Sequence, residues 1–243
     1  MRTPNIIRFV RRTIWLAILI AAVLVAFIWF RPGREDVPWT PLVLSDPIGL
    51  STGRKIVKLT DDRDGCMALL ESSGLEFTAL EPRGENECRV PDGVRIDAGQ
   101  DLLALTPTSV TPACPVMIGL LVWQTQVVQP QAQAIFGAKV ARIETFGSFS
   151  CRRMYGRGEG AWSEHATADA IDISGFVLTD GRRISVLEHW PNRDDRALFL
   201  KNVRDGACEL FSTVLSPEYN AAHADHLHID LANRGDMGWR ACR

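Results

Sequence analysis

The sequence predicts an α+β domain, with helices packed on a mostly antiparallel sheet, that follows an N-terminal transmembrane helix. Three observations lead to this fold class. An uncharged apolar run stands near the start of the chain, short segments of the second half alternate polar and apolar residues, and two longer segments carry apolar residues at helical spacing. Short strands mixed with helices in this way are typical of a sheet covered by helices.

The N-terminal segment is predicted to be a membrane anchor. Residues 1–12 contain four arginines and no acid, and residues 13–30 carry no charged side chain. A helix of that length rises about 27 Å, close to the thickness of the hydrocarbon core of a bilayer. The arginines orient residues 1–12 to the cytoplasm and the rest of the chain outward. A cleaved signal peptide is the alternative, but the run is long and no small-x-small cleavage site follows it.

The composition allows one exported globular domain. The chain has 243 residues and a formal net charge of −2, so we expect no nucleic-acid partner. Residues 31–60 contain four prolines and few periodic apolar positions, which predicts a tether that becomes the first ordered segment of the domain. Residues 61–243 are predicted to form the domain itself.

All six cysteines lie after the apolar run, and none forms a CxxC pair. An even number at wide spacing in an exported domain indicates up to three disulfides. The spacing does not determine the pairing. We expect Cys66 to pair with Cys88, and the other four cysteines to hold the C-terminal half together.

The first part of the domain is predicted to mix one short helix with strands. Residues 66–80 have the pattern of a helix that turns at Gly74 into a strand. Residues 88–98 and 101–107 alternate in the manner of strands and surround Pro-Asp-Gly and Ala-Gly turns.

Two longer segments are predicted to be helical. Residues 112–137 carry apolar side chains three to four positions apart, and Pro130 is expected to break or restart that helix. Residues 192–215 have the same periodicity, with Asn192 or Asp194 as the N-cap.

The sheet is predicted mainly from four segments. Residues 139–152 alternate, and residues 171–178 and 182–190 are rich in β-branched side chains on either side of a Thr-Asp-Gly-Arg turn, which indicates a hairpin. Residues 225–231, Asp-His-Leu-His-Ile-Asp-Leu, alternate polar and apolar side chains and are expected to be the last strand.

This last strand carries two of the chain's five histidines. Strand spacing places His226, His228 and Asp230 on one face and the apolar residues between and after them on the core face. The strand can therefore direct two imidazoles into one cleft. The spacing is short and common, so two surface histidines explain it equally well when it is taken alone.

A second polar cluster stands upstream, where His165 and Asp172 are seven residues apart. The two would share a helix face, but the β-branched residues around Asp172 favour a strand, with His165 on the loop that enters it. Together the clusters supply two histidines and one aspartate. Three such ligands leave a fourth position for water, which is the arrangement of catalytic zinc. Other divalent ions remain possible with the same ligands.

These segments resemble those of known zinc enzymes. Residues 163–173, Ser-Glu-His-Ala-Thr-Ala-Asp-Ala-Ile-Asp-Ile, resemble the SxHxxGxAxD motif of zinc D-Ala-D-Ala peptidases and related murein endopeptidases. Residues 225–230 resemble their second motif, in which an acid stands three residues before the last histidine ligand. From about Pro38 to the end, the chain resembles the bacterial extensin-like C-terminal domain family. The resemblance implies the fold of zinc D-Ala-D-Ala peptidases and hedgehog-type proteins.

The resemblance also implies roles for individual residues. His165, Asp172 and His228 would bind Zn²⁺. Asp225 would be the general base, because a carboxylate beside the metal can accept a proton from the attacking water. His226 would stabilise the oxyanion of the reaction, or would serve as an alternative ligand.

Two further positions are implied to bind substrate. Ser163 would contact the substrate, or would order the loop through its hydroxyl group. Arg152 would bind a peptide carboxylate with its guanidinium, a role that the neighbouring Arg153 could also take. The sequence departs from the motif at two positions, because Ala168 replaces the usual glycine and Asp169 the commoner asparagine. Glycine would permit a positive φ there, which alanine tolerates poorly.

The expected function is that of a zinc-dependent peptidase acting on peptidoglycan stem peptides or crosslinks. We expect a single-pass protein of the inner membrane whose C-terminal domain lies in the periplasm. The alternative is a non-catalytic envelope protein that binds murein or a partner and keeps a structural zinc site. His189 and His223 are expected to be surface histidines, although either could support the metal ligands.

Overall fold

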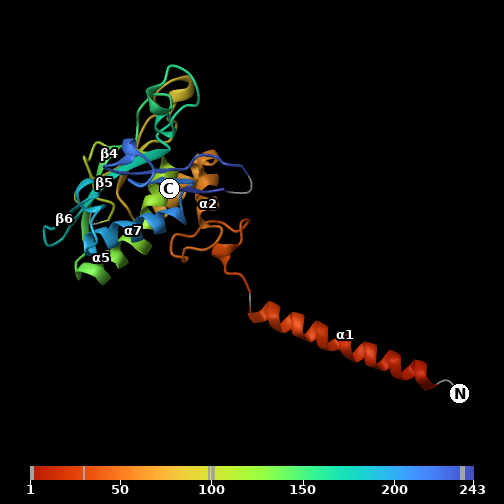
Figure 1. Ribbon diagram of the computed structural model, residues 1–243. Helices are drawn as coiled ribbons and strands as arrows, with labels where there is room; N and C mark the ends of the chain where they lie inside the picture. Colours follow the sequence, from red (N-terminus) through yellow and green to blue (C-terminus); the bar gives the residue numbers. More distant parts are fainter. Residues whose placement is uncertain (1–2, 30, 98, 100–101, 236–238) are drawn as a thin grey trace.

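A computed structural model describes residues 3–29, 31–97, 99, 102–235 and 239–243. Helix α1 (Thr3–Trp29) stands apart from the rest of the chain, as Figure 1 shows. The window Ile6–Ala26 is long and apolar enough to cross a membrane, and none of it is buried against the domain. A signal sequence near the N-terminus meets the same criteria, so this helix is compatible with either an anchor or a signal.

The described strands form one large mixed sheet and one small one. The large sheet has the order β3–β4–β5–β8–β7–β9, and β6 pairs with β5. These strands are β3 (Leu105–Thr106), β4 (Val140–Gly147), β5 (Ala170–Leu178), β6 (Arg183–Ser185), β7 (Thr213–Leu215), β8 (Leu227–Asp230) and β9 (Ala241–Cys242). The pairs β3–β4 and β7–β9 are parallel and the others are antiparallel, so the prediction of a mostly antiparallel sheet is confirmed. Strands β1 (Phe77–Ala79) and β2 (Val94–Ile96) form a separate antiparallel pair.

Helices pack against the sheet and form the core with it. They are α2 (Thr52–Lys58), α3 (Arg63–Ser72), α4 (Cys114–Trp123), α5 (Gln129–Phe136), α6 (Val186–His189) and α7 (Asp195–Cys208). Every residue of α4 is buried. The ring of Phe176 on β5 lies 5.9 Å from that of Trp123 on α4 and 5.1 Å from that of Phe199 on α7. Figure 1 shows α5 and α7 running side by side below the strands. The α+β class is therefore confirmed.

The long helices follow their sequence patterns closely. The segment predicted as one helix over 112–137 consists of α4, a π-helical turn (Gln124–Val128) and α5. Pro130 is the second residue of α5 and follows the π-helical turn directly, so the hydrogen-bond pattern of the helix changes next to the proline while the backbone stays helical. Asp194 caps α7 by accepting a hydrogen bond from the N–H of Ala197, at 3.0 Å.

Element boundaries differ from the predictions at two places. The helix predicted over 192–215 ends at Cys208, and Thr213–Leu215 form strand β7 of the sheet instead. The second half of the 182–190 segment is not strand but the short helix α6, because the Ser185 hydroxyl caps the N–H of Glu188 and starts a turn. Residues 31–60, expected to be a tether that becomes the first ordered segment of the domain, contain α2, whose Ile56 is fully buried in the core. Lys55 is buried as well, and its ammonium donates to the carbonyl of Arg34 and the hydroxyl of Thr40. This segment is therefore part of the packed domain.

Three disulfides are present, but their pairing differs from the expected one. Cys66 pairs with Cys114, Cys88 with Cys151, and Cys208 with Cys242. The expected pair Cys66–Cys88 is wrong because α3 packs on α4, which brings buried Cys66 to the first residue of α4. Cys88 instead joins its loop to the loop after β4.

A bulge in β5 lets one strand serve both the core and a polar face. The register of β5 against β4 shifts next to Ile173. Because a bulge reverses the alternation of side chains, Ile173 and Phe176 can both face the core although they are three positions apart, and both are fully buried. Asp172 precedes the bulge and points to the opposite face.

Candidate metal centre

Asp172 and His228 are cross-strand neighbours on that polar face. Strands β5 and β8 pair antiparallel with Asp172 opposite His228. Leu227 and Ile229 on either side of His228 are fully buried, which fixes the orientation of the imidazole away from the core. The sequence prediction that His228 and Asp230 share the face opposite the apolar residues is confirmed.

His165 reaches the same place from a tight loop. It lies in a 3₁₀ turn (Glu164–Ala166), and its own N–H donates to the Ser163 hydroxyl, which caps the turn. The loop returns to β5 through Ala168, whose φ is +62° and whose side chain is fully buried. The motif's usual glycine would adopt this conformation without strain, and alanine holds it at a cost of about 1–2 kcal/mol.

The three predicted ligands converge. Nε2 of His165 lies 3.2 Å from Oδ1 of Asp172 and 3.1 Å from Nδ1 of His228, and this Nδ1 lies 3.0 Å from the same Oδ1. Their ligand atoms all lie within 4.8 Å of one another. Ligands about 2.1 Å from a tetrahedral metal lie roughly 3.4 Å apart, so this spacing fits zinc with little rearrangement.

The outer nitrogen of each histidine has its own acceptor. Nδ1 of His165 donates to the carbonyl of Ser148 at 3.1 Å, and Nε2 of His228 donates to Oδ2 of Asp230 at 3.0 Å. With a metal bound, each bond would leave the lone pair of the other nitrogen directed at the shared centre. Partners of this kind hold the rings and select the tautomer at metal sites. Asp230 is therefore a supporting acid and not one of the three ligands.

The charges at the centre are strongly coupled. Burial lowers the pKa of His228, but hydrogen bonds to Asp172 and Asp230 outweigh it and raise the pKa to about 9. Burial raises the pKa of Asp172, but its hydrogen-bonding contacts with the imidazoles of His165 and His228 outweigh it and hold the pKa well below its usual value. Without a metal, the cluster thus retains one carboxylate and a positive charge on His228. A divalent cation would replace that proton.

Asp225 and His226 form a pair beside the ligands. Nδ1 of His226 lies 2.8 Å from Oδ1 of Asp225, and its Nε2 lies 3.5 Å from Oδ1 of Asp172. The Asp225 side chain is 47% exposed and is not among the residues that line the cavity over the metal ligands. The carboxylate thus contacts the outer side of the imidazole, and His226 faces the centre.

Two further groups lie at the centre: His223, which was expected to be a surface histidine or a support for the ligands, and Glu164, which the sequence did not single out. The ring of His223 lies 5.2 Å from that of His226 and 5.9 Å from that of His228, and its Nδ1 is bound by Asn220. Burial and the charges of His226 and His228 lower the pKa of His223 to about 4, so the imidazole is neutral at pH 7. Glu164 also lines the cavity, and burial, followed by neighbouring acids, raises its pKa to about 7.

His189 is not a surface histidine, contrary to expectation. It is 8% exposed and accepts a hydrogen bond from the N–H of Ser185, at 2.9 Å. Its other nitrogen contacts the guanidinium of Arg196. The ring stabilises the start of α6 and does not belong to the metal centre.

A cavity of about 430 Å³ opens over the three ligands. Arg152 and Ser163 both line it, whereas Arg153 stacks its guanidinium 4.4 Å from the centre of the Trp162 ring and donates to the carbonyl of Gly160. Of the two arginines, Arg152 is thus available to a substrate. The volume lies within the usual range of ligand sites.

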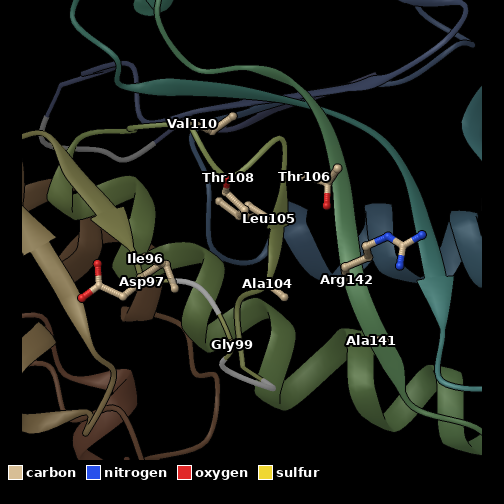
Figure 2. Close-up of a pocket in the computed structure, with 10 residues that line it drawn as sticks. All are labelled: Ile96, Asp97, Gly99, Ala104, Leu105, Thr106, Thr108, Val110, Ala141 and Arg142. Atoms are coloured by element: carbon tan, nitrogen blue, oxygen red, sulfur yellow. The ribbon is translucent and has the colours of Figure 1, made fainter.

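A second cavity has no comparable chemistry. It measures about 330 Å³ and lies between β2 and the strands β3 and β4. Figure 2 shows its polar side chains Asp97 and Arg142 pointing away from each other. No histidine or cysteine occurs among the described residues that line it. Of these two cavities, the one over the ligands is the one in which histidines and carboxylates converge.

Fold and site together define an α+β domain with a candidate metal centre of two histidines and one aspartate. A family model described as extensin-like protein C-terminus matches residues 64–243. The chain belongs to this family, as its sequence motifs predicted. Neither the curated proteins nor the solved structures yielded a match to the chain.

Proposed function

We propose that this protein is a zinc-dependent peptidase that acts on peptidoglycan stem peptides or crosslinks. The observation that carries the proposal is the convergence of Nε2 of His165, Oδ1 of Asp172 and Nδ1 of His228 beneath a cavity. Two imidazoles and one carboxylate without a thiolate are the ligands of hydrolytic zinc sites. We further propose that the domain is related to zinc D-Ala-D-Ala peptidases, whose motifs its sequence resembles.

Bound zinc would supply a Lewis acid and lower the pKa of a coordinated water. The Asp225–His226 pair is positioned for proton transfer at this place, since Asp225 orients the ring and Nε2 of His226 faces the ligands. We therefore assign proton transfer to His226 and a positioning role to Asp225. This division of roles differs from the general base that the sequence motif implies for Asp225.

Substrate binding is assigned to the wall of the cavity. The guanidinium of Arg152 would bind a carboxylate of the peptide by a charge-assisted pair. The Ser163 hydroxyl lines the cavity but already accepts from the N–H of His165, so its first role is to hold the ligand loop. We propose that α1 crosses the inner membrane once and that the C-terminal domain lies in the periplasm, since the helix is long and apolar enough to span a bilayer and disulfides persist in an oxidising compartment.

The test is zinc analysis of the purified full-length protein, with mass spectrometry of peptidoglycan fragments after incubation. We expect about one zinc per chain and the loss or shortening of stem peptides. If the protein contains no zinc and the peptidoglycan fragments are not cleaved, the proposal is wrong. A non-catalytic murein-binding protein would bind zinc and leave the fragments intact, and Asp225→Ala would then behave as the wild type.

A further inference from the structure

Only a short segment links α1 to the domain. Helix α1 ends at Trp29, and residues 30–33 separate it from Arg34, which the domain holds in place. Fully extended, such a segment spans no more than about 18 Å. In Figure 1, α1 meets the domain on the side of α2, whereas β6 lies at the opposite edge. A membrane crossed by α1 would therefore lie close to the face around α2.

The 3₁₀ turn Arg34–Asp36 is fixed to the start of α2 by hydrogen bonds. The ammonium of Lys55 donates to the carbonyl of Arg34 at 2.6 Å, and the hydroxyl of Ser51 donates to the carbonyl of Asp36 at 2.7 Å. Lys55 and Ser51 are both buried, so water does not compete for these bonds. The segment after α1 thus joins the packed domain directly and does not act as a hinge.

The same face carries exposed apolar side chains. Among the described residues after α1, the three most exposed large hydrophobic side chains are those of Trp39 (83%), Leu50 (79%) and Trp239 (67%). Trp39 stands in a turn whose Thr40 hydroxyl donates to the carbonyl of Arg34, at 2.6 Å. The N–H of Leu50 donates to the carboxylate of Asp36, at 2.9 Å. Two exposed apolar side chains are therefore held next to the place where the chain enters the domain.

Basic side chains border these apolar ones. Arg54 and Lys58 are exposed and lie one turn apart on α2, and the ammonium of Lys58 donates to the carbonyl of Pro38 at 3.3 Å. Both side chains line a cavity of about 400 Å³. Its lining also holds Trp239, the arginines Arg234 and Arg240, and the acid Asp61. Although Arg240 is paired with Glu209, positive charge remains in excess here.

We propose that this face docks on the bilayer that α1 crosses, with Trp39 and Leu50 in the interfacial layer and with Arg54 and Lys58 against anionic lipid headgroups. Tryptophan is enriched at membrane interfaces, and basic groups near the surface are attracted to anionic lipids. The short link keeps the face within reach of the bilayer. The proposal rests on the membrane crossing of α1 proposed above and gives the domain one orientation to the membrane.

Single labels can measure the depth of this face, because all six native cysteines are paired in disulfides. Full-length Trp39→Cys and Leu50→Cys, each labelled with an environment-sensitive nitrobenzoxadiazole dye, are placed in nanodiscs of anionic phospholipid that contain spin-labelled lipid. Leu187→Cys is the matched control, since Leu187 is 59% exposed on α6, directly after β6 at the opposite edge (Figure 1). We expect the spin label to quench the dye at least about twofold more strongly at positions 39 and 50 than at 187.

Equal quenching at all three positions would overturn the docking. A dye at position 39 that is shifted to the blue but is not quenched by the spin-labelled lipid would also overturn it, because a second copy or another protein would then cover the face. No peptide substrate is present in the measurement. Its result therefore holds whether or not the protein is a peptidase.

The role of the basic side chains is tested by changing the charge of the lipid. Neutral nanodiscs should weaken the quenching at position 39 at least about twofold, and Arg54→Gln/Lys58→Gln should have the same effect in anionic nanodiscs. Arg182→Gln/Arg183→Gln is the matched control, since both arginines are exposed and lie at the β6 edge. It should leave the quenching unchanged. If neither the neutral lipid nor the α2 variant weakens the quenching, the assigned headgroup contact is wrong.

Discussion

Nδ1 of His228 lies 3.0 Å from Oδ1 of Asp172, across a cross-strand pair of β5 and β8. The opposite nitrogen of the same ring is held by Asp230 at 3.0 Å. One imidazole thus stands between two carboxylates, one of which shares the proposed metal while the other supports the ring. A substitution of Asp230 therefore tests whether the second carboxylate supports His228 as a ligand.

Replacing the supporting acid should weaken zinc binding without removing a ligand. We expect Asp230→Asn to lower zinc affinity about 10- to 100-fold, the usual effect of losing the acceptor behind a histidine ligand. His228→Gln should lower it much further. Competition with a chelator of known affinity measures both, with the exposed Asp205→Asn as control. Equal affinities for Asp230→Asn and wild type would show that Asp230 does not support the ligand.

Zinc binding should release a proton at neutral pH. The pKa of His228 in the metal-free protein is about 9, so its imidazole is protonated at pH 7 and must lose that proton to bind a metal. Apparent affinity should therefore rise about tenfold per pH unit up to about pH 9 and then level off. Calorimetry in buffers of different ionisation enthalpy counts the protons. A count of zero at pH 7 would contradict a charged His228.

The positions of some residues of this centre can be predicted from their spacing in the sequence, and the positions of others cannot. Asp172 and His228 lie on strands whose neighbouring residues are apolar, so period-two alternation alone sets their direction. The place of His223 depends on a turn that Asn220 stabilises after β7, and no periodicity describes such a turn. Cysteine pairing failed for the same reason, because it follows from the packing of α3 on α4 and not from spacing.

The positions of Asp225 and His226 show a further limit. Strand spacing placed His226 on the face of His228, yet it precedes β8, and the turn there brings the Asp225 carboxylate behind its ring. An acid three residues before a ligand can face the metal or a neighbouring side chain. The local backbone geometry decides which of the two the acid faces, and the sequence motif does not specify that geometry.

Asp225 should act only through His226. We expect Asp225→Ala to retain zinc and lower kcat about 10²- to 10⁴-fold, the range of a general acid–base contribution. Since the acid orients the histidine, the double variant Asp225→Ala/His226→Ala should be no slower than His226→Ala alone. Steady-state kinetics on a stem peptide measure this. Fully additive losses would mean that Asp225 meets the substrate or the water independently.

The disulfide Cys88–Cys151 should matter for activity as well as stability. It closes a sequence separation of 63 residues, so the double serine variant should lose about 4 kcal/mol of unfolding free energy. Because Cys151 precedes Arg152, kcat/KM should fall further than the folded fraction does. The serine variant of Cys66–Cys114 is the matched control, with a separation of 48 residues, a similar expected loss of stability and no contact with the cavity. Equal effects on kcat/KM would contradict a role in positioning Arg152.

The left-handed backbone at Ala168 gives a prediction that needs no metal. Ala168 and Ala170 are both fully buried, two residues apart, but only Ala168 has a positive φ. Glycine at either position loses a buried methyl group and gains entropy in the unfolded chain, and both changes are destabilising. At position 168, glycine also relieves about 1–2 kcal/mol of backbone strain. Ala168→Gly should therefore be at least about 1 kcal/mol less destabilising than Ala170→Gly in urea unfolding. Equal losses would mean that the loop between His165 and β5 is not strained, and that the missing glycine of the motif has no cost here.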